Sequence, residues 1–320
     1  MTILMRDHTG KASLHNGVVA APGVDTEALA AELREAVRGE VRFDQGSRAL
    51  YATDASIYRQ TPIGVVIPKD SESVVQTVAL ARRHGTPILA RGCGTSLEGQ
   101  CCNIAVVIDF SKYLNNILQI DSARKLARVQ PGVICDQLRS AAEQYQLTFG
   151  PDPATHNHCT LGGMIGNNAC GVHSVMAGKT VDNIEDLEIL TYDGLRLRVG
   201  PTGDAELEQI IREGGRRGQI YADLKALRDQ YADLIRRRYP RIPRRVSGYN
   251  LDELLPENGF NVARALVGTE STCITVLEAT TRLVDSPQVR AAGAGLRGCL
   301  YCRRPRHGDY GTSADWPRAL

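Results

Sequence analysis

The sequence predicts a globular fold that mixes helices and strands. Short apolar runs rich in valine and isoleucine alternate with longer segments whose apolar residues recur at helical spacing. Hydrophobic residues make up 42% and charged residues 23% of the 320-residue chain, as in folded proteins with a sizeable core. No apolar run approaches the roughly 18 residues of a transmembrane helix, so none is predicted.

Capping residues and helical spacing mark the expected helices. Asp25 precedes leucines at helical spacing and Gly39 follows them, which predicts a helix over 25–38. Asp70 and Gly85 bound a second such segment in the same way. This second segment predicts a helix over 70–84, and further helices are expected over 136–145 and 219–238.

β-branched runs bounded by turn residues mark the expected strands. Residues 184–192 and 195–199 form a predicted hairpin through Tyr192, Asp193 and Gly194. The other predicted strands span residues 63–67, 87–90, 105–109, 263–267 and 273–277. Residues 149–174 are dominated by Gly, Pro, Asn and His, and such a long irregular segment in a compact domain is typical of a functional loop.

Charge and cysteine usage narrow the class of protein. A net charge of +2 and an aromatic content of 5% argue against a nucleic-acid partner. The nine cysteines show neither a disulfide framework nor zinc-ligand spacing, and the first twenty residues contain no apolar run of signal-peptide length. We therefore expect free thiols and a cytoplasmic location, either free or peripheral to a membrane.

The first chemical motif is the segment 91–100, Arg-Gly-Cys-Gly-Thr-Ser-Leu-Glu-Gly-Gln, between two predicted strands. Its three glycines let the backbone turn sharply, and successive N–H groups in such a turn form a concavity for anions. The segment lacks the GK[ST] of a phosphate-binding P-loop and no helix follows it as in a dinucleotide-binding fingerprint. It fits a pyrophosphate; a plain glycine-rich turn is the alternative.

Three further motifs follow in order. The second combines Pro-Asp-Pro-Ala-Thr at 151–155 with Thr-Leu-Gly-Gly-Met-Ile-Gly-Asn-Asn-Ala-Cys-Gly at 160–171. Its small residues suit close packing of backbone against a flat cofactor, or a buried loop that satisfies its own hydrogen bonds. The third is Gly-Lys-Thr-Val-Asp-Asn-Ile at 178–184, and the fourth is Val-Gly-Thr-Glu-Ser-Thr-Cys-Ile at 267–274.

In this order and spacing, the four motifs resemble the FAD-binding domain of the vanillyl-alcohol oxidase/p-cresol methylhydroxylase (PCMH) family. Within it they are similar to the FAD-linked dehydrogenases of D-lactate, glycolate and D-2-hydroxyglutarate. The resemblance covers roughly residues 45–285. It implies a PCMH-type α+β fold of two α+β subdomains with FAD between them, and hydride transfer from a 2-hydroxyacid to flavin N5.

The resemblance also implies which residues contact FAD. The backbone from Gly92 to Ser96 would hold the pyrophosphate, supported by Arg91 and Gln100. The second motif would line the path to the flavin, and the third and fourth would bound the adenine and ribitol sides. The expected cofactor-binding residues are Arg91, Gly92, Cys93, Gly94, Thr95, Ser96, Gln100, Pro151, Asp152, Thr155, Thr160, Gly162, Gly163, Asn167, Gly171, Asp182, Ile184, Glu270, Ser271, Thr272 and Ile274.

The substrate side is expected in the arginine-rich segment 236–251. Ser-Gly-Tyr-Asn-Leu at 247–251 is similar to the segment that brings a Tyr-Asn pair near the flavin in the hydroxyacid branch. A guanidinium can bind the carboxylate of a 2-hydroxyacid in a bidentate manner. We therefore take Arg245 and Asn250 as the candidate catalytic residues; the alternative is that the arginines form a solvated face.

The histidines are not assigned a role. His156 and His158 lie in the second motif, but a metal site would need a further ligand that the sequence does not identify. We expect them to be loop histidines with local hydrogen-bond partners, and we expect no metal. Some members of the wider family attach FAD covalently through a histidine, whereas the hydroxyacid branch usually does not, and the sequence leaves this point open.

The resemblance also sets the expected domain organisation. Residues 1–44 are a leader with a short helix, residues 45–285 the FAD-binding domain, and residues 286–320 an irregular tail outside the family pattern. Relatives continue into a substrate domain, so we expect a C-terminally shortened chain with a break near Pro287. A complete protein would pass electrons to a quinone, an electron-transfer protein or an iron–sulfur region. The alternative function is a non-catalytic FAD-binding subunit, or an inactive fragment, that needs a partner chain.

Overall fold

A computed structural model describes residues 24–287 of the chain. Residues 24–285 belong to one compact unit, and the description below concerns that unit. Expectations for the leader before residue 24, and for the tail after residue 287, lie outside the described residues. None of the helices within residues 24–287 is long and apolar enough to span a bilayer.

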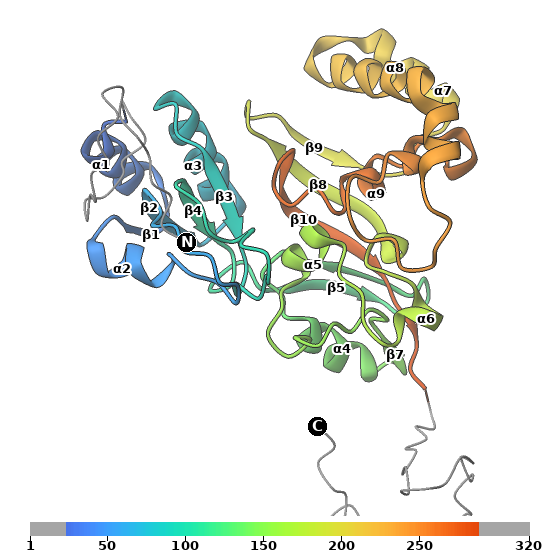
Figure 1. Ribbon diagram of the computed structural model, residues 1–320, viewed down its shortest axis with the longest axis horizontal. Helices are drawn as coiled ribbons and strands as arrows, with labels where there is room; N and C mark the ends of the chain where they lie inside the picture. Colours follow the sequence, from blue (N-terminus) through green and yellow to red (C-terminus); the bar gives the residue numbers. More distant parts are fainter. Residues whose placement is uncertain (1–23, 288–320) are drawn as a thin grey trace, which may run out of the picture. The chain divides into compact units, whose positions relative to one another are not determined.

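The first half of the unit is built on a four-stranded sheet of order β1-β2-β4-β3. The strands are β1 (Gly39–Arg42), β2 (Gly64–Pro68), β3 (Ile88–Arg91) and β4 (Val106–Asp109), with β1 antiparallel to β2 and the others parallel. Helices α1 (Thr26–Ala36) and α3 (Ser71–Arg83) pack together beside the sheet, whereas α2 (Gln45–Leu50) lies between β1 and β2 in the chain (Figure 1).

The parallel arrangement follows from local sequence. Asp70 caps α3 because its carboxylate accepts the backbone N–H of Ser73 at 2.8 Å. Val74, Val78 and Ala81 lie on one side of the helix and are fully buried. The helix therefore carries the chain from β2 back to the start of β3, which places the segment after β3 at the carboxyl edge of the sheet.

The second half is built on a five-stranded antiparallel sheet of order β5-β6-β10-β8-β9. Its strands are β5 (Ile117–Asp121), β6 (Leu126–Val129), β8 (Ile184–Thr191), β9 (Arg196–Val199) and β10 (Ile274–Arg282). The last long strand, β10, lies in the middle and pairs with β6 on one side and β8 on the other. A separate pair joins β7 (Leu147–Thr148) to β11 (Val284–Asp285).

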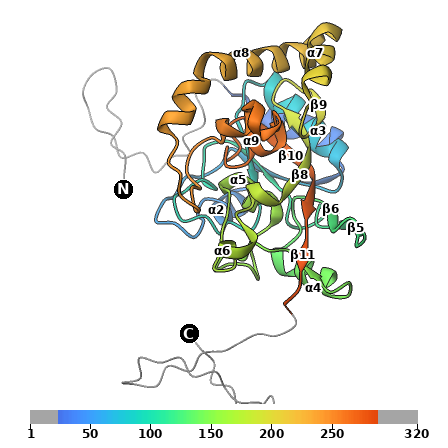
Figure 2. The same ribbon diagram turned by 90° about the vertical axis from the view of Figure 1, so that its right-hand side faces the viewer.

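Helices surround this second sheet. They are α4 (Cys135–Glu143), α5 (Leu161–Asn167), α6 (Ser174–Ala177), α7 (Asp204–Glu213), α8 (Gly215–Arg238) and α9 (Val262–Leu266), with single turns η1 (Val181–Asn183), η2 (Leu251–Leu254) and η3 (Pro256–Asn258). α7 and α8 pack against each other, and η2 lies against α8 (Figure 2). The largest hydrophobic core cluster joins residues of α4 and α5 to the sheet, among them Leu138, Leu161, Ile184 and Ala279.

The structure confirms the predicted α+β fold of two subdomains and corrects three element assignments. Residues 263–267 were predicted as a strand, but 263–266 belong to α9 and Val267 caps its end, because Asn261 starts a helix there by accepting the Arg264 N–H at 3.1 Å. The segment 149–174 contains α5, which Thr160 caps. The helix predicted over 219–238 begins at Gly215 and follows a further helix, α7.

Candidate functional site

A cavity lies where three segments meet: the loop after β3, helix α5, and the turn that leads into β10. It encloses about 710 Å³ of empty space, part of it open to solvent. Its lining comprises Ala90, Arg91, Gly92, Ser96, Gln100, Cys101, Phe110, Pro131, Thr160, Gly162, Gly163, Ile165, Gly166, Asn167, Leu266, Thr269, Glu270, Ser271, Ile274 and Val276. Both sheets therefore contribute to one site.

The loop after β3 forms the first wall, and Arg91 fixes its shape. The Arg91 guanidinium donates to three backbone carbonyls, those of Thr53 at 2.7 Å, Cys101 at 2.8 Å and Tyr51 at 3.2 Å. Gly94 has φ of +69°, and a β-carbon there would lie 2.6 Å from Arg91 Nη2. The arginine thus braces the loop from within, and only glycine fits beside it.

Helix α5 forms the second wall, in contact with the first. A β-carbon at Gly92 would collide with the Thr160 side chain, so the loop backbone lies directly against the start of α5. A β-carbon at Gly162 would lie 2.7 Å from Pro131 Cβ. The two glycines are therefore required by close packing between segments.

The turn before β10 forms the third wall. Gly268 N–H donates to the Ile165 carbonyl at 2.8 Å, and Glu270 N–H to the Gly166 carbonyl at 3.0 Å. Glu270 and Ser271 both have positive φ, 48° and 63°, which is unusual for residues with side chains and is retained where surrounding contacts fix the backbone.

A hydrogen bond from Gln100 Nε2 to Glu270 Oε1, at 3.2 Å, links this turn to the first wall. The three walls are thus joined to one another through both backbone and side-chain contacts.

The structure brings just over half of the predicted cofactor-binding residues together. Those that line the cavity are Arg91, Gly92, Ser96, Gln100, Thr160, Gly162, Gly163, Asn167, Glu270, Ser271 and Ile274. Those outside its lining are Cys93, Gly94, Thr95, Pro151, Asp152, Thr155, Gly171, Asp182, Ile184 and Thr272. The first three of the second set belong to the same loop as Gly92, and Thr272 directly follows Ser271.

Asp152 and Gly171 lie in a separate cluster. The buried Asp152 carboxylate accepts the backbone N–H of His173 at 3.0 Å and contacts its Nδ1 at 2.5 Å. A β-carbon at Gly171 would collide with the Asp152 backbone. These contacts hold together the loop between α5 and α6.

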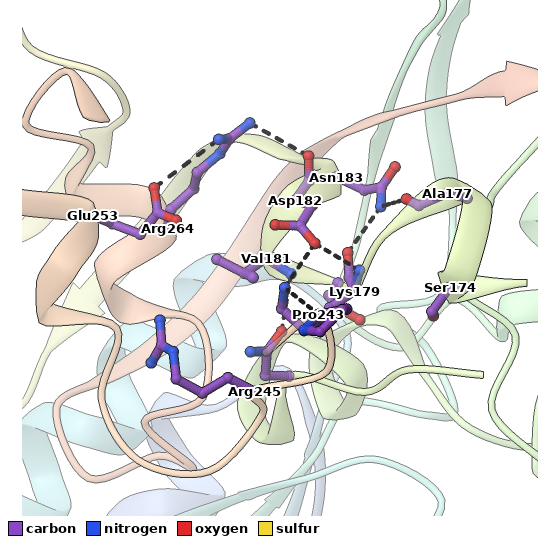
Figure 3. Close-up of polar contacts among 12 residues, drawn as sticks. Ser174, Ala177, Lys179, Val181, Asp182, Asn183, Pro243, Arg245, Glu253 and Arg264 are labelled. Atoms are coloured by element: carbon purple, nitrogen blue, oxygen red, sulfur yellow. Dashed lines mark hydrogen bonds and ion pairs between the residues drawn. The ribbon is translucent and has the colours of Figure 1, made fainter. Parts of the chain in front are cut away.

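Asp182 lies in η1, Ile184 is the first residue of β8, and both are engaged within the protein, as Figure 3 shows for Asp182. The Asp182 carboxylate accepts the Lys179 backbone N–H at 2.8 Å and the Lys179 ammonium at 3.0 Å, and the same ammonium reaches the Pro243 carbonyl at 3.3 Å. Arg264 donates to the backbone carbonyls of Asp182 and Ile184, at 3.3 and 3.2 Å. This network attaches α9 and the segment after α8 to the start of β8.

Glu253 lies at the edge of the same network, 4.0 Å from the Arg264 guanidinium. Burial raises the pKa of the Glu253 carboxyl, and nearby Arg264 opposes the shift.

The two candidate catalytic residues are also engaged within the protein. One Arg245 nitrogen contacts both Asp252 carboxylate oxygens, at 2.6 and 2.7 Å, and its guanidinium stacks 4.6 Å from the Tyr239 ring centre. Asn250 is buried, and its Nδ2 donates to the Val267 carbonyl at 2.7 Å. Neither lines the cavity. Asp252 pairs with the Arg245 guanidinium in this structure, and the catalytic role expected of Arg245 and Asn250 stays a prediction.

The histidines have separate local partners. His156 Nδ1 contacts Asp136 at 2.7 Å, and His158 Nδ1 contacts Asn157 at 2.7 Å. Among residues 24–287, no three or more His, Cys, Asp or Glu side chains gather in a way that could hold a metal ion.

The lining residues that the sequence did not single out are mostly apolar or small. They are Ala90, Cys101, Phe110, Pro131, Ile165, Gly166, Leu266, Thr269 and Val276. Gly166, Ile165 and Thr269 stand inside the quoted motifs, so the motif boundaries could have included them. The others look like ordinary core or strand residues, and only the fold shows that they face the cavity.

The cavity's chemistry fits FAD. Apolar side chains such as Phe110, Ile165 and Val276 suit a flat ring system, whereas the glycine backbone suits a pyrophosphate. Asn167 provides a sharper test, because its buried Oδ1 has no hydrogen-bond partner among the described residues. Buried polar atoms are rarely left unpaired, so this oxygen fits a ligand donor such as a hydroxyl or ring N–H.

Comparisons with known proteins agree with this geometry. The FAD binding domain family model matches residues 62–200. D-2-hydroxyglutarate dehydrogenase from Pseudomonas putida is 35% identical over 266 residues, which is 82% of this chain and 26% of that protein. Glycolate oxidase subunit GlcD from Escherichia coli is 35% identical over 185 residues, or 57% of this chain and 37% of that subunit.

The fold is also similar to a solved structure of alkyldihydroxyacetonephosphate synthase. The TM-score is 0.58 at 18% identity, and the match covers 82% of this chain and 44% of that one. The chain spans about a quarter of the length of the D-2-hydroxyglutarate dehydrogenases that it matches. The matches together show that this chain contains a PCMH-type FAD-binding domain and that its cofactor is FAD.

Proposed function

We propose that this chain is the FAD-binding part of a flavin-dependent dehydrogenase that oxidises a D-2-hydroxyacid, such as D-2-hydroxyglutarate or D-lactate, to the 2-oxoacid. The observation that carries the proposal is the cavity with the unpartnered Asn167 Oδ1, built from the segments by which the chain matches D-2-hydroxyglutarate dehydrogenases. When bound, FAD would accept the hydride from the substrate carbon.

The chain's own residues would bind and orient the cofactor. We propose that the backbone of Gly92–Ser96 holds the pyrophosphate, with Arg91 shaping the loop from behind. Gly162, Gly163 and Asn167 on α5 would pack along the cofactor, and Glu270 with Ser271 would close the opposite side. Of the predicted residues outside the lining, Asp152, Gly171, Asp182 and Ile184 would support these walls through the contacts described above.

The substrate side would be formed by the segment 239–250. This segment is attached to Lys179 at Pro243, and Tyr249 contacts the Thr272 hydroxyl at 2.7 Å, next to the cavity. We propose that Arg245 and Asn250 position the segment. The neighbouring Arg244 is exposed, contacts the Cys170 sulfur at 3.1 Å and forms no ion pair with any described residue, so its guanidinium would meet the carboxylate of the substrate.

The remaining parts of the proposal concern the setting of the reaction. The free cysteines fit a cytoplasmic location. In the whole protein, electrons would leave the flavin to a quinone, an electron-transfer protein or an iron–sulfur region. Residues 45–285 would be the FAD-binding domain, flanked by the leader and the tail.

Flavin spectroscopy tests the proposal. The purified chain should carry or take up FAD with the absorbance bands of a bound flavin. Anaerobic D-2-hydroxyglutarate, D-lactate or glycolate should then bleach the oxidised flavin, whereas the L enantiomers of the first two should not. FAD binding without bleaching would favour the alternative, a non-catalytic FAD-binding subunit. A chain that cannot be reconstituted with FAD would contradict the whole assignment.

A further inference from the structure

Two buried cysteines lie opposite each other beside the cavity. The backbone N–H of Cys135, at the start of α4, donates to the Cys159 carbonyl at 3.0 Å. The adjacent residues Ile134 and Thr160 form an isolated antiparallel bridge, and the Cys135–Cys159 backbone hydrogen bond is the next contact across it. Cys159 directly precedes Thr160, which lines the cavity.

This backbone arrangement is compatible with a disulfide. Directly opposed residues of an antiparallel pair have Cα atoms about 4.5–5.5 Å apart. Disulfides span Cα separations of about 4.4–6.8 Å, so no large backbone movement is needed to join the two.

The two thiol groups also influence each other. Their interaction lowers the pKa of Cys159 and, together with burial, raises that of Cys135. Cys159 is therefore the thiol that ionises more readily, and its thiolate is the nucleophile of disulfide chemistry. Cys135 also contacts the Pro151 carbonyl at 3.5 Å.

A purely structural role would not account for this pairing. Buried cysteines commonly act as small apolar side chains, and Cys135 lies in the same core cluster as Leu138, Phe149 and Leu161. An apolar role, however, does not require a second cysteine directly across the backbone hydrogen bond.

We propose that Cys135 and Cys159 form a disulfide-forming modification site that reacts with small two-electron thiol oxidants such as a diazene or a low-molecular-mass disulfide. The two S–H bonds break and one S–S bond forms, while two electrons and two protons pass to the oxidant. The bond would join the start of α4 to the segment that enters α5. The inference rests on residues that the proposed function does not use, so either can fail without the other.

Peptide mapping of the full chain tests the site. The chain is treated with diamide, alkylated and digested with trypsin under non-reducing conditions. Cleavage after Arg128, Arg139 and Lys179 separates peptide 129–139, which carries Cys135, from peptide 140–179, which carries Cys159 and Cys170. The expected product is the two peptides joined by a reducible bond, with two fewer free thiols than the nine of the untreated chain.

Matched variants identify the partner. Cys170→Ser should keep the linked product, because Cys170 contacts Arg244 and not Cys135. Cys159→Ser should abolish it, as should Cys135→Ser. Cys102→Ser removes another buried cysteine and should leave it unchanged. The oxidised chain should also unfold at a higher temperature than the reduced chain, and only when both cysteines are present.

The wild-type map decides the question even if a variant fails to fold. Recovery of peptide 129–139 alkylated at Cys135 after oxidation would overturn the proposal. So would a linkage that persists in Cys159→Ser.

Discussion

The Thr160 hydroxyl occupies the space that a β-carbon of residue 92 would need. Gly92 belongs to the loop after β3, which forms the first wall, and Thr160 caps α5, which forms the second. This contact therefore joins the two walls of the cavity. The width of the cavity between these walls therefore depends on one missing side chain.

Gly92→Ala should weaken FAD binding strongly, by about tenfold or more, because the new methyl group must push the loop away from α5. The measurement is FAD affinity by fluorescence titration of the apoprotein. Gly203→Ala is the matched control, since nothing lies within 4 Å of its β-carbon position and its φ is ordinary. Equal affinities for the two variants would show that the contact does not shape the cofactor site.

Arg91→Lys should lower both stability and FAD affinity. A lysine ammonium cannot reproduce the planar set of donors that contacts the carbonyls of Tyr51, Thr53 and Cys101. We expect a loss of about 2 kcal/mol in the free energy of unfolding. Urea denaturation with and without FAD measures both effects. Retention of wild-type values would mean that the loop holds its shape without the brace.

Arg244 and Arg245 should respond differently to substitution by methionine. Arg244→Met should leave the unfolding midpoint within the error of the measurement and should weaken any flavin response to D-2-hydroxyglutarate. Arg245→Met should instead lower the midpoint, because Asp252 and Tyr239 lose their partner. Thermal unfolding and flavin spectra separate the two. If Arg245→Met weakened the flavin response and Arg244→Met lowered the unfolding midpoint, Arg245 would be the carboxylate ligand.

Glu40 should make stability sensitive to acid. Lys112, Tyr113 and Arg42 surround its carboxylate, and these hydrogen bonds lower its pKa to about 2. Because the folded-state pKa lies below the ordinary 4.5, the ionised carboxylate stabilises the fold above about pH 4.5. This stabilisation is lost as the pH falls toward 2.

Glu40→Gln should therefore cost about 1 kcal/mol at pH 7, a value kept small by solvent screening, and almost nothing near pH 2. Denaturant unfolding across this range measures the difference. A constant difference at all pH values would point to packing and not to charge.

Substitution of Glu253 should have the opposite effect on stability. Its pKa is raised by burial, so the ionised carboxylate disfavours the fold as the pH rises through that value. Glu253→Gln should raise stability at pH 7 by about 0.5 kcal/mol. Arg264 keeps its contacts with the carbonyls of Asp182 and Ile184 in the variant. A destabilised variant would show that the ion pair outweighs the burial.

The sequence predicted the parts of the site that depend on residue type. Gly92, Gly162 and Asn167 could be recognised because glycines and amides in such runs have few other uses. Phe110, directly after β4, and Val276, in β10, could not, since apolar residues in or beside strands look alike whether they face a core or a cofactor. Residues 263–267 were predicted wrongly because a five-residue apolar run fits a strand or a buried helical turn equally well.

Arg245 shows a different limit. The sequence contains six arginines between 236 and 245, but it does not show which carboxylates pair with them in the folded protein. Asp252 lies only seven residues away, yet the turn that brings it to Arg245 depends on Asn250 and its hydrogen bond to Val267. The pairing is thus set by tertiary contacts and not by local pattern.

The central place of β10 has a consequence for synthesis on the ribosome. Residues 274–282 leave the ribosome after β5, β6, β8 and β9, yet they fill the gap between β6 and β8. Until then, two strand edges stay unpaired, and such edges readily pair with other chains. Nascent chains should therefore be most prone to aggregation just before β10 emerges, and chaperone demand should peak in that interval.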